Sequence, residues 1–252
     1  MNLLILGGTS EASALGRALA GDARFNATIS LAGRTQNPAP QALPVRIGGF
    51  GGVAGLMRYL IEHRIDVLID ATHPFAAQMT RNAEAAARQT RTAALVLQRP
   101  AWQMQSGDHW IGVPNLPEAA LALGSGARRV LLTIGQKDLA PFVAASHHHY
   151  VLRSVDAPKP ESLPVYAKVI TARGPFALAD ELTLLRDQRI DILVTKNSGG
   201  DATEAKLTAA RMLGMPVIMV ARPAPPTADT VATVAEALAW LTCGHATHRR
   251  GE

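Results

Sequence analysis

Several polar residues that could do chemistry follow one short apolar segment. Residues 65–69 are almost wholly apolar, as in a strand buried on both faces of a parallel sheet. Asp70, Thr72 and His73 come directly after it, and Pro74 suits the first turn of a following helix. Ligands of open α/β sheets bind at the carboxyl ends of the strands. We therefore predict Asp70 and His73 as the acid–base candidates of the chain.

A glycine turn follows the first predicted strand, residues 2–6. Gly7 and Gly8 permit a tight turn and a close approach of the backbone to a ligand, and Thr9 or Ser10 can cap the next helix. The pattern departs from the standard G-x-G-x-x-G, so a plain strand-to-helix turn is the alternative to nucleotide binding. We favour nucleotide binding because the residues that end the second predicted strand suit a dinucleotide.

That second strand, predicted over residues 27–32, ends in Gly33, Arg34 and Thr35. An acidic residue at this place would bind a ribose hydroxyl and select NAD, whereas an arginine suits the 2′-phosphate of NADP. A solvated surface arginine is the alternative. A second glycine-rich stretch, with Gly49 and Phe50 at its centre, indicates another place where backbone lies close to a ligand or a neighbouring loop.

The sequence also repeats itself. Arg64-Ile65-Asp66 is matched by Arg189-Ile190-Asp191, and three other pairs of segments recur in the same order. This predicts an α/β fold with two tandem Rossmann-like domains, mainly parallel sheets and a ligand cleft between them. We place the domains at residues 1–125 and 126–243, with a polar tail at 244–252. The segment around Trp110 has no settled place, so the sequence leaves open whether one domain completes the sheet of the other.

The second half supplies cationic and amide groups where the first has glycines and acid–base candidates. This favours a dinucleotide on the first half and an anionic substrate held by the second. Capping of helices is the alternative role for about half of these residues. The side chains in question are Lys137, Arg153, Lys196 and Asn197.

Composition narrows the class of protein. The chain has 252 residues, of which 48% are hydrophobic, a net charge of +5 and a single cysteine. A disulfide within the chain and a cysteine metal cluster are therefore excluded, and the run His147–His149 is interpreted as a surface turn, so no metal site is expected. Neither a membrane span, a signal peptide nor a basic arm for nucleic acid is evident, so we expect a cytoplasmic protein.

Seven motifs together resemble the precorrin-6x reductase family of cobalamin biosynthesis, over about residues 2–241. The combination of DATHPFA with VTKNSGG is the specific part. The motifs are ILGGTSEA (5–12), LAGRT (31–35), GGFGG (48–52), DATHPFA (70–76), R-P-x-W (99–102), GQKDL (135–139) and VTKNSGG (194–200).

The resemblance implies an NADPH-dependent reductase that reduces one double bond of the tetrapyrrole precorrin-6A to give precorrin-6B, with no metal or flavin. A cobalt-bearing analogue is the substrate in the anaerobic route. We expect hydride transfer from a nicotinamide and a proton from His73 or solvent, with Asp70 orienting His73 or binding a ribose. Residues 7–11, Ala71 and Thr72 would position the cofactor, and Arg34 its 2′-phosphate. The substrate carboxylates would meet Lys137, Arg153 and residues 196–199, namely Lys196, Asn197, Ser198 and Gly199.

Two other classes compete with this interpretation. One is a non-catalytic two-domain binder of small molecules, which would not oxidise NADPH. The other is a two-domain transferase with a nucleotide-sugar donor, which would give Arg34 no reason to follow the second strand. We expect the chain to act as a monomer.

Overall fold

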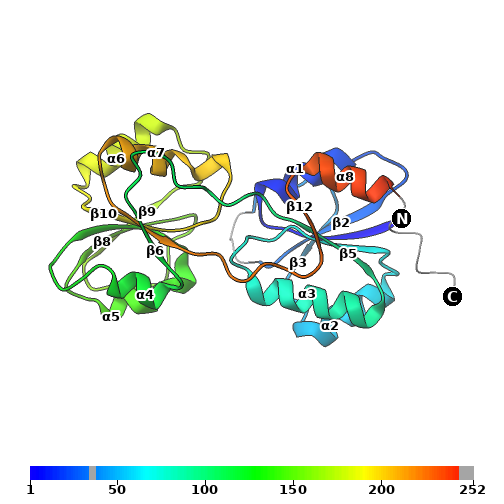
Figure 1. The fold of residues 1–252 in the computed structure, drawn as a ribbon. Helices are drawn as coiled ribbons and strands as arrows, with labels where there is room; N and C mark the ends of the chain where they lie inside the picture. Colours follow the sequence, from blue (N-terminus) through cyan, green and yellow to red (C-terminus); the bar gives the residue numbers. More distant parts are fainter. Residues whose placement is uncertain (34–37, 244–252) are drawn as a thin grey trace. The chain divides into compact units, whose positions relative to one another are not determined.

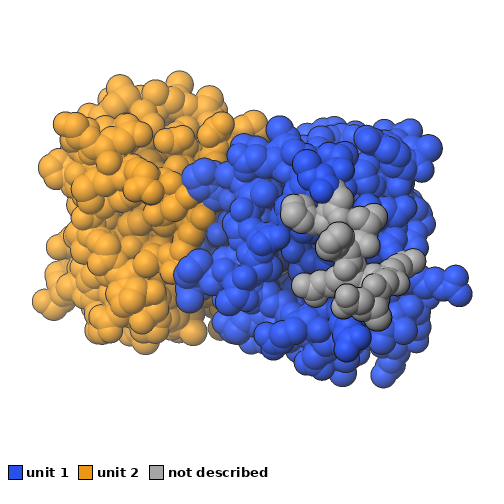
Figure 2. Space-filling model, turned by 45° about the vertical axis from the view of Figure 1, so that its right-hand side comes forward, with its two compact units in different colours: residues 1–100, 223–252 blue, residues 101–222 orange. Residues whose placement is uncertain are grey.

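The chain forms two compact units, seen here in a computed structural model that describes residues 1–33 and 38–243. Unit 1 comprises residues 1–100 and the segment from 223 onward, and unit 2 comprises residues 101–222 (Figure 2). Each unit contains one six-stranded sheet in which every neighbouring pair of strands is parallel. The predicted α/β class with parallel sheets is confirmed.

The sheet of unit 1 has the strand order β12-β5-β4-β1-β2-β3, with helices on both faces (Figure 1). Helices α1 and α8 share one apolar core, and α2 and α3 share the other. The elements are β1 (Asn2–Leu6), α1 (Ser10–Leu19), β2 (Asn26–Leu31), β3 (Val45–Ile47), α2 (Gly52–Glu62), β4 (Val67–Asp70), α3 (Ala77–Thr90), β5 (Ala93–Leu97), β12 (Asp229–Val231) and α8 (Val234–Thr242).

The sheet of unit 2 has the corresponding order β6-β11-β10-β7-β8-β9, with α6 and α7 packed on one face. Helices α4 and α5 lie on the other (Figure 1). The elements are β6 (Trp110–Val113), α4 (Leu116–Leu121), β7 (Arg129–Thr133), η1 (Gln136–Asp138), α5 (Ala140–Ala144), β8 (His149–Ser154), η2 (Pro160–Ser162), β9 (Ala167–Thr171), α6 (Leu178–Asp187), β10 (Ile192–Lys196), η3 (Asp201–Thr203), α7 (Ala205–Met212) and β11 (Val217–Val220).

The central strands are apolar on both faces because helices cover both faces of the sheet. In β1, Leu3 and Ile5 point into the core beneath α1 and α8, whereas Leu4 and Leu6 point into the core beneath α2 and α3. All four side chains are almost completely buried. A continuous apolar run of this kind is the mark of a parallel strand between two helical layers.

The unit boundaries differ from the predicted boundary at residue 125. β6 pairs with β11, so residues 101–125 belong to unit 2, and β12 pairs with β5, so residues 223–243 belong to unit 1. Each half of the sequence thus gives its sixth strand to the other sheet, the possibility that the sequence left open. Sheet pairing uses backbone hydrogen bonds that any strand can make. With two similar sheets, sequence order alone therefore could not assign the sixth strands.

The repeated Arg-Ile-Asp segments have the same structural role in both units. Arg64 and Arg189 each adopt a left-handed conformation, with φ of 48° and 49°. The carboxylate of Asp66 accepts a hydrogen bond from the backbone N–H of Asn2 at 2.8 Å, and that of Asp191 accepts one from the N–H of Arg129 at 2.7 Å. The repeat therefore ends a helix and anchors the first strand of each sheet.

The histidine run is only partly a surface turn. His147 and His149 are exposed, but His148 has no exposed surface and packs edge-on against Tyr150. By hydrogen-bond geometry neither ring nitrogen has a partner among the described residues. Among these residues there is also no group of side chains that could hold a metal ion, and no helix long and apolar enough to cross a membrane.

Candidate functional site

The glycine turn after β1 contains two glycines with different physical requirements. A Cβ on Gly7 would lie 2.8 Å from Cγ1 of Ile29, so this position must be glycine for β1 to pack beside β2. Gly8 has a φ of +115°, which other residues rarely adopt, and a Cβ built on it would face open space. Gly8 therefore leaves backbone accessible to a ligand, whereas Gly7 is required by packing.

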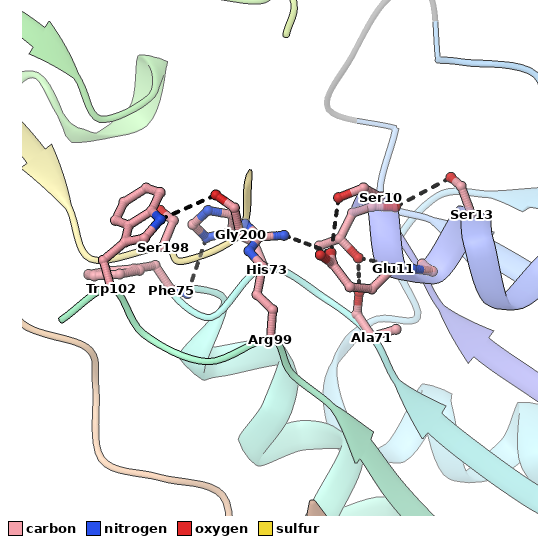
Figure 3. Close-up of polar contacts among 12 residues, drawn as sticks. Ser10, Glu11, Ser13, Ala71, His73, Phe75, Arg99, Trp102, Ser198 and Gly200 are labelled. Atoms are coloured by element: carbon pink, nitrogen blue, oxygen red, sulfur yellow. Dashed lines mark hydrogen bonds and ion pairs between the residues drawn. The ribbon is translucent and has the colours of Figure 1, made fainter. Parts of the chain in front are cut away.

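Thr9 joins this turn to the loop after β4. Its hydroxyl accepts a hydrogen bond from the N–H of Ala12 at 3.1 Å, which caps α1, and donates one to the carbonyl of Ala71 at 2.7 Å (Figure 3). β1 and β4 are parallel neighbours, so both loops leave the same edge of the sheet. The predicted cofactor residues of the two loops are thus brought together, with Thr9 as the link.

Asp70 is held in the turn after β4 by hydrogen bonds to its carboxylate. It is 4% exposed, and one carboxylate oxygen accepts bonds from the backbone N–H and the hydroxyl of Thr72, at 3.0 and 2.7 Å. The other accepts a bond from the hydroxyl of Thr80 at 2.6 Å. Because both oxygens are engaged in this way, Asp70 shapes the turn after β4 and ties it to α3. The predicted contact that would orient His73 is not among the bonds of this carboxylate.

His73 is half-buried in the same turn. Its Nδ1 accepts a hydrogen bond from the backbone N–H of Phe75 at 3.2 Å (Figure 3). A ring nitrogen that accepts a bond carries no proton, so the neutral imidazole holds its proton on Nε2. In this tautomer the hydrogen-bond donor of the His73 ring is its Nε2–H.

An ion pair at this edge of the sheet was missed by the sequence reasoning. Glu11, in the first turn of α1, binds the guanidinium of Arg99 just after β5, with 2.7 Å between Oε2 and Nη1 (Figure 3). The hydroxyl of Ser10 also donates to Oε2, at 3.1 Å. The sequence signals for Arg99 were its place in the R-P-x-W motif and in the internal repeat, where Arg222 is its counterpart.

The second glycine-rich loop is organised by another missed residue, Arg46 on β3. Its guanidinium donates to the carbonyl of Gly49 at 2.9 Å and lies 3.8 Å from the ring centre of Phe50. A Cβ on Gly49 would meet open space. Gly33 has a φ of +68°, and the predicted residues that follow it, Arg34 and Thr35, lie outside the described residues.

In unit 2, the loop after β10 is held by side chains that bind its backbone and its neighbours. The amide of Asn197 accepts a bond from the N–H of Trp102 at 2.8 Å and donates to its carbonyl at 3.0 Å. Arg222 donates to the carbonyls of Asn197 and Ser198, at 2.8 and 3.0 Å. The indole of Trp102 donates to the carbonyl of Gly200 at 3.2 Å. Asn197 and Trp102 are thus part of the framework of this loop.

The three predicted cationic residues of unit 2 differ in environment. Lys137 is exposed on η1, and the ammonium of Lys196 pairs with the carboxylate of Asp138 on the adjacent loop. Arg153 is buried, pairs with the buried carboxylate of Glu181, and lies 3.9 Å from the ring centre of Phe176. The charge of Arg153 is thus balanced inside the unit by Glu181. Ser198 is half-buried beside Lys196, and Gly199 is buried with a φ of +67°.

Comparison with known proteins identifies the family. The sequence model described as precorrin-6x reductase CbiJ/CobK matches residues 2–242. The chain belongs to this family. It is 51% identical to the precorrin-6A reductase of Rhodobacter capsulatus, over 98% of both chains, and 46% identical to that of Mycobacterium tuberculosis, over 95% of this chain and 96% of the other. A solved structure titled CobK precorrin-6A reductase has a TM-score of 0.92 at 50% identity, with 98% of each chain covered.

Members that act on the cobalt-bearing substrate are more distant. The cobalt-precorrin-6A reductase of Priestia megaterium is 29% identical over 88% of this chain and 90% of its own length. The family expected from the seven motifs is therefore confirmed, as are the class of enzyme, a reductase of cobalamin biosynthesis, and its Rossmann-like architecture.

Proposed function

We propose that this chain reduces precorrin-6A to precorrin-6B with NADPH, holding the dinucleotide at the carboxyl edge of the sheet in unit 1 and substrate carboxylates with unit 2. The cobalt-free substrate is favoured because the relatives with 46–51% identity are precorrin-6A reductases. The main support for placing NADPH here is the Thr9–Ala71 hydrogen bond, which joins the glycine turn after β1 to the loop after β4 that contains His73.

The residues of this edge fit a dinucleotide. Cβ atoms built on Gly8, Gly49, Gly51 and Gly52 would all enter open space, so a phosphate or a sugar can approach the backbone at these positions. We assign cofactor binding to Gly8, Thr9, Ser10, Gly33, Gly49, Phe50, Ala71 and Thr72, with Gly7 supporting the turn. Arg34 and Thr35 follow in sequence and would receive the 2′-phosphate. NADPH, when bound, supplies the hydride.

His73 is our candidate proton donor. The N–H of Phe75 bonds to Nδ1 and leaves the proton of the neutral ring on Nε2. Asp70 is not assigned to proton transfer, because its two oxygens accept three hydrogen bonds from Thr72 and Thr80. It holds the turn that presents His73. Solvent is the alternative proton source, and the pH dependence of a His73→Gln variant distinguishes the two.

In unit 2, we assign carboxylate binding to Lys137, Lys196, Ser198 and Gly199. Lys137 is exposed, and Lys196 is held in place by Asp138 on the neighbouring loop. A lysine fixed by a carboxylate loses less side-chain freedom when it binds a substrate carboxylate. Asn197 and Arg153, by contrast, stabilise the loops around these groups.

The decisive experiment is a turnover assay with purified protein, precorrin-6A and NADPH. We expect loss of NADPH absorbance and a product heavier than the substrate by two hydrogens, with slower turnover on NADH and on cobalt-precorrin-6A. Binding of both ligands without NADPH oxidation would favour the non-catalytic binder. A monomer in the cytoplasm stays our expectation, and sedimentation analysis tests the oligomeric state.

A further inference from the structure

The Glu11–Arg99 pair places a carboxylate beside the proposed dinucleotide site. Glu11 stands in the first turn of α1, directly after the Gly7–Ser10 turn. A negative charge at a helix N-terminus stabilises the helix, but it also repels any other anion that approaches that end. The diphosphate of NADPH is such an anion. On charge alone, Glu11 is thus an unfavourable residue for this position.

Arg99 removes this conflict. Its guanidinium meets Glu11 at 2.7 Å, and the two side chains are only 15% and 20% exposed, so the pair is largely shielded from water and salt. Arg99 reaches the turn from the end of β5, two strands away from β1 in the sheet order. The contact is therefore a feature of the folded sheet and not of the local helix.

The equivalent arginine of unit 2 has a different partner. Arg222 follows β11 as Arg99 follows β5, and both precede a proline. Arg222 donates to two backbone carbonyls. Asp138 is nine residues after Arg129, the first residue of β7, as Glu11 is nine residues after Asn2, the first residue of β1, and Asp138 is paired with Lys196. The carboxylate–arginine pair is thus specific to the unit with the glycine turn.

We propose that Arg99 is a positioning residue for the dinucleotide: it neutralises Glu11 and fixes its carboxylate, so that the turn after β1 accepts a diphosphate. This inference rests on the proposed placement of NADPH in unit 1. It differs from the expectation that Glu11 itself binds the cofactor. If Glu11 bound the cofactor, removal of its carboxylate would weaken NADP⁺ binding. If Arg99 serves to neutralise Glu11, removal of the carboxylate should restore NADP⁺ binding in a variant that lacks Arg99.

The test measures NADP⁺ affinity by calorimetry for the wild type, Arg99→Gln, Glu11→Gln and the double variant. We expect Arg99→Gln to weaken binding by about tenfold or more, and the double variant to return to within about threefold of the wild type. Glu11→Gln alone should bind as well as the wild type or better.

Arg24→Gln is the matched control, because Arg24 forms an exposed pair with Asp22 at 2.7 Å before β2, at the opposite edge of the sheet. Its affinity should equal that of the wild type. A thermal melt of each variant separates lost binding from lost folding.

An unchanged Arg99→Gln affinity, or a double variant as weak as Arg99→Gln, would overturn the role given to Arg99. The second result would indicate that Arg99 contacts the phosphates directly. Failure of the wild type to bind NADP⁺ would instead refute the proposed function, and this inference with it.

Discussion

The loops after β1 and β4 of unit 1 can be compared with the loops after β7 and β10 of unit 2. The carboxylates of Asp66 and Asp191 accept bonds from the N–H groups of Asn2 and Arg129, which aligns the two sheets. Counting onward from these residues matches Glu11 with Asp138 and Ala71 with Lys196. In unit 1 the loops are joined by the hydroxyl of Thr9 and the carbonyl of Ala71. In unit 2 they are joined by the ion pair of Asp138 and Lys196.

This difference fits our proposal that one architecture serves two kinds of ligand. Where the loop after β4 of unit 1 offers only backbone at Ala71, Gly8 keeps the neighbouring turn open. In unit 2 the corresponding residue is Lys196, and the carboxylate of Asp138 in the loop after β7 forms an ion pair with it. An open backbone suits phosphates and sugars, whereas fixed cations suit carboxylates. The following variants test this division of roles.

The largest effect is expected from Arg153→Met in unit 2. This change leaves the carboxylate of Glu181 buried without its charged partner, at a cost of about 3–5 kcal/mol in the free energy of unfolding. Urea denaturation followed by circular dichroism measures it. The double variant Arg153→Met with Glu181→Leu should recover most of the loss. A mild effect of the single variant would mean that Arg153 is not a framework residue.

Lys196→Ala should weaken the binding of precorrin-6A without changing the binding of NADPH. We expect its KM for precorrin-6A to rise by about tenfold or more, because one charge-assisted bond to a carboxylate is lost, while NADPH affinity is unchanged. Steady-state kinetics and calorimetry supply the two readouts. Lys168→Ala is the control, since Lys168 is an exposed lysine on β9. Equal loss of both ligands would contradict the assignment of substrate binding to unit 2.

Arg34→Ala tests the cofactor preference of unit 1. If Arg34 binds the 2′-phosphate, the wild type should prefer NADPH to NADH by at least about tenfold, and the variant should lose most of that preference. Fluorescence titration with both cofactors measures it. Similar affinities of the wild type for the two cofactors would refute the role of Arg34.

Thr9→Val removes the link between the loops of unit 1. Loss of the cap and of the bond to Ala71 should lower the free energy of unfolding by about 1 kcal/mol and weaken NADPH binding severalfold. Thr9→Ser keeps the hydroxyl and should behave like the wild type. If Thr9→Val weakened precorrin-6A binding and left NADPH binding intact, the placement of the cofactor would be wrong.

The smallest effect concerns His148, which corresponds to Phe25 of unit 1 in the strand register. Burial lowers the pKa of His148 below 6.5, with smaller contributions in the same direction from His147 and Arg128. Below pH 6.5 the unfolded chain therefore binds a proton that the folded chain does not, and stability falls by at most about 1.4 kcal/mol per pH unit.

His148→Phe gives unit 2 the residue that unit 1 has at Phe25. The variant should lose the part of the pH dependence of stability that His148 causes. Thermal melts between pH 5 and 8 measure the slope for both proteins, and an unchanged slope in the variant would show that another group is responsible.

Much of the fold could be predicted because it rests on local patterns. The apolar run before Asp70 gave a buried parallel strand, and the Arg-Ile-Asp repeat gave two similar halves. Side-chain roles were harder to predict. Asp70 and Arg153 were expected to face ligands, a prediction that stays open, and the structure adds that they bond to Thr80 and Glu181, which the sequence did not indicate. Arg99 and Arg222 were missed because their partners lie on other strands or loops. Arg46 was missed although its partners, Gly49 and Phe50, follow it closely in sequence.

The sequence by itself determined the family, the parallel α/β class and the loops that carry polar residues, because hydrophobic periodicity, glycine turns and specific motifs are local properties of the chain. Only the tertiary structure decided which sheet receives β6 and β12, and which charged groups face each other. Strand pairing relies on backbone groups common to all residues, and ion pairs depend on distances across the sheet. The spacing of residues along the chain therefore predicts neither the strand pairing nor the ion pairs.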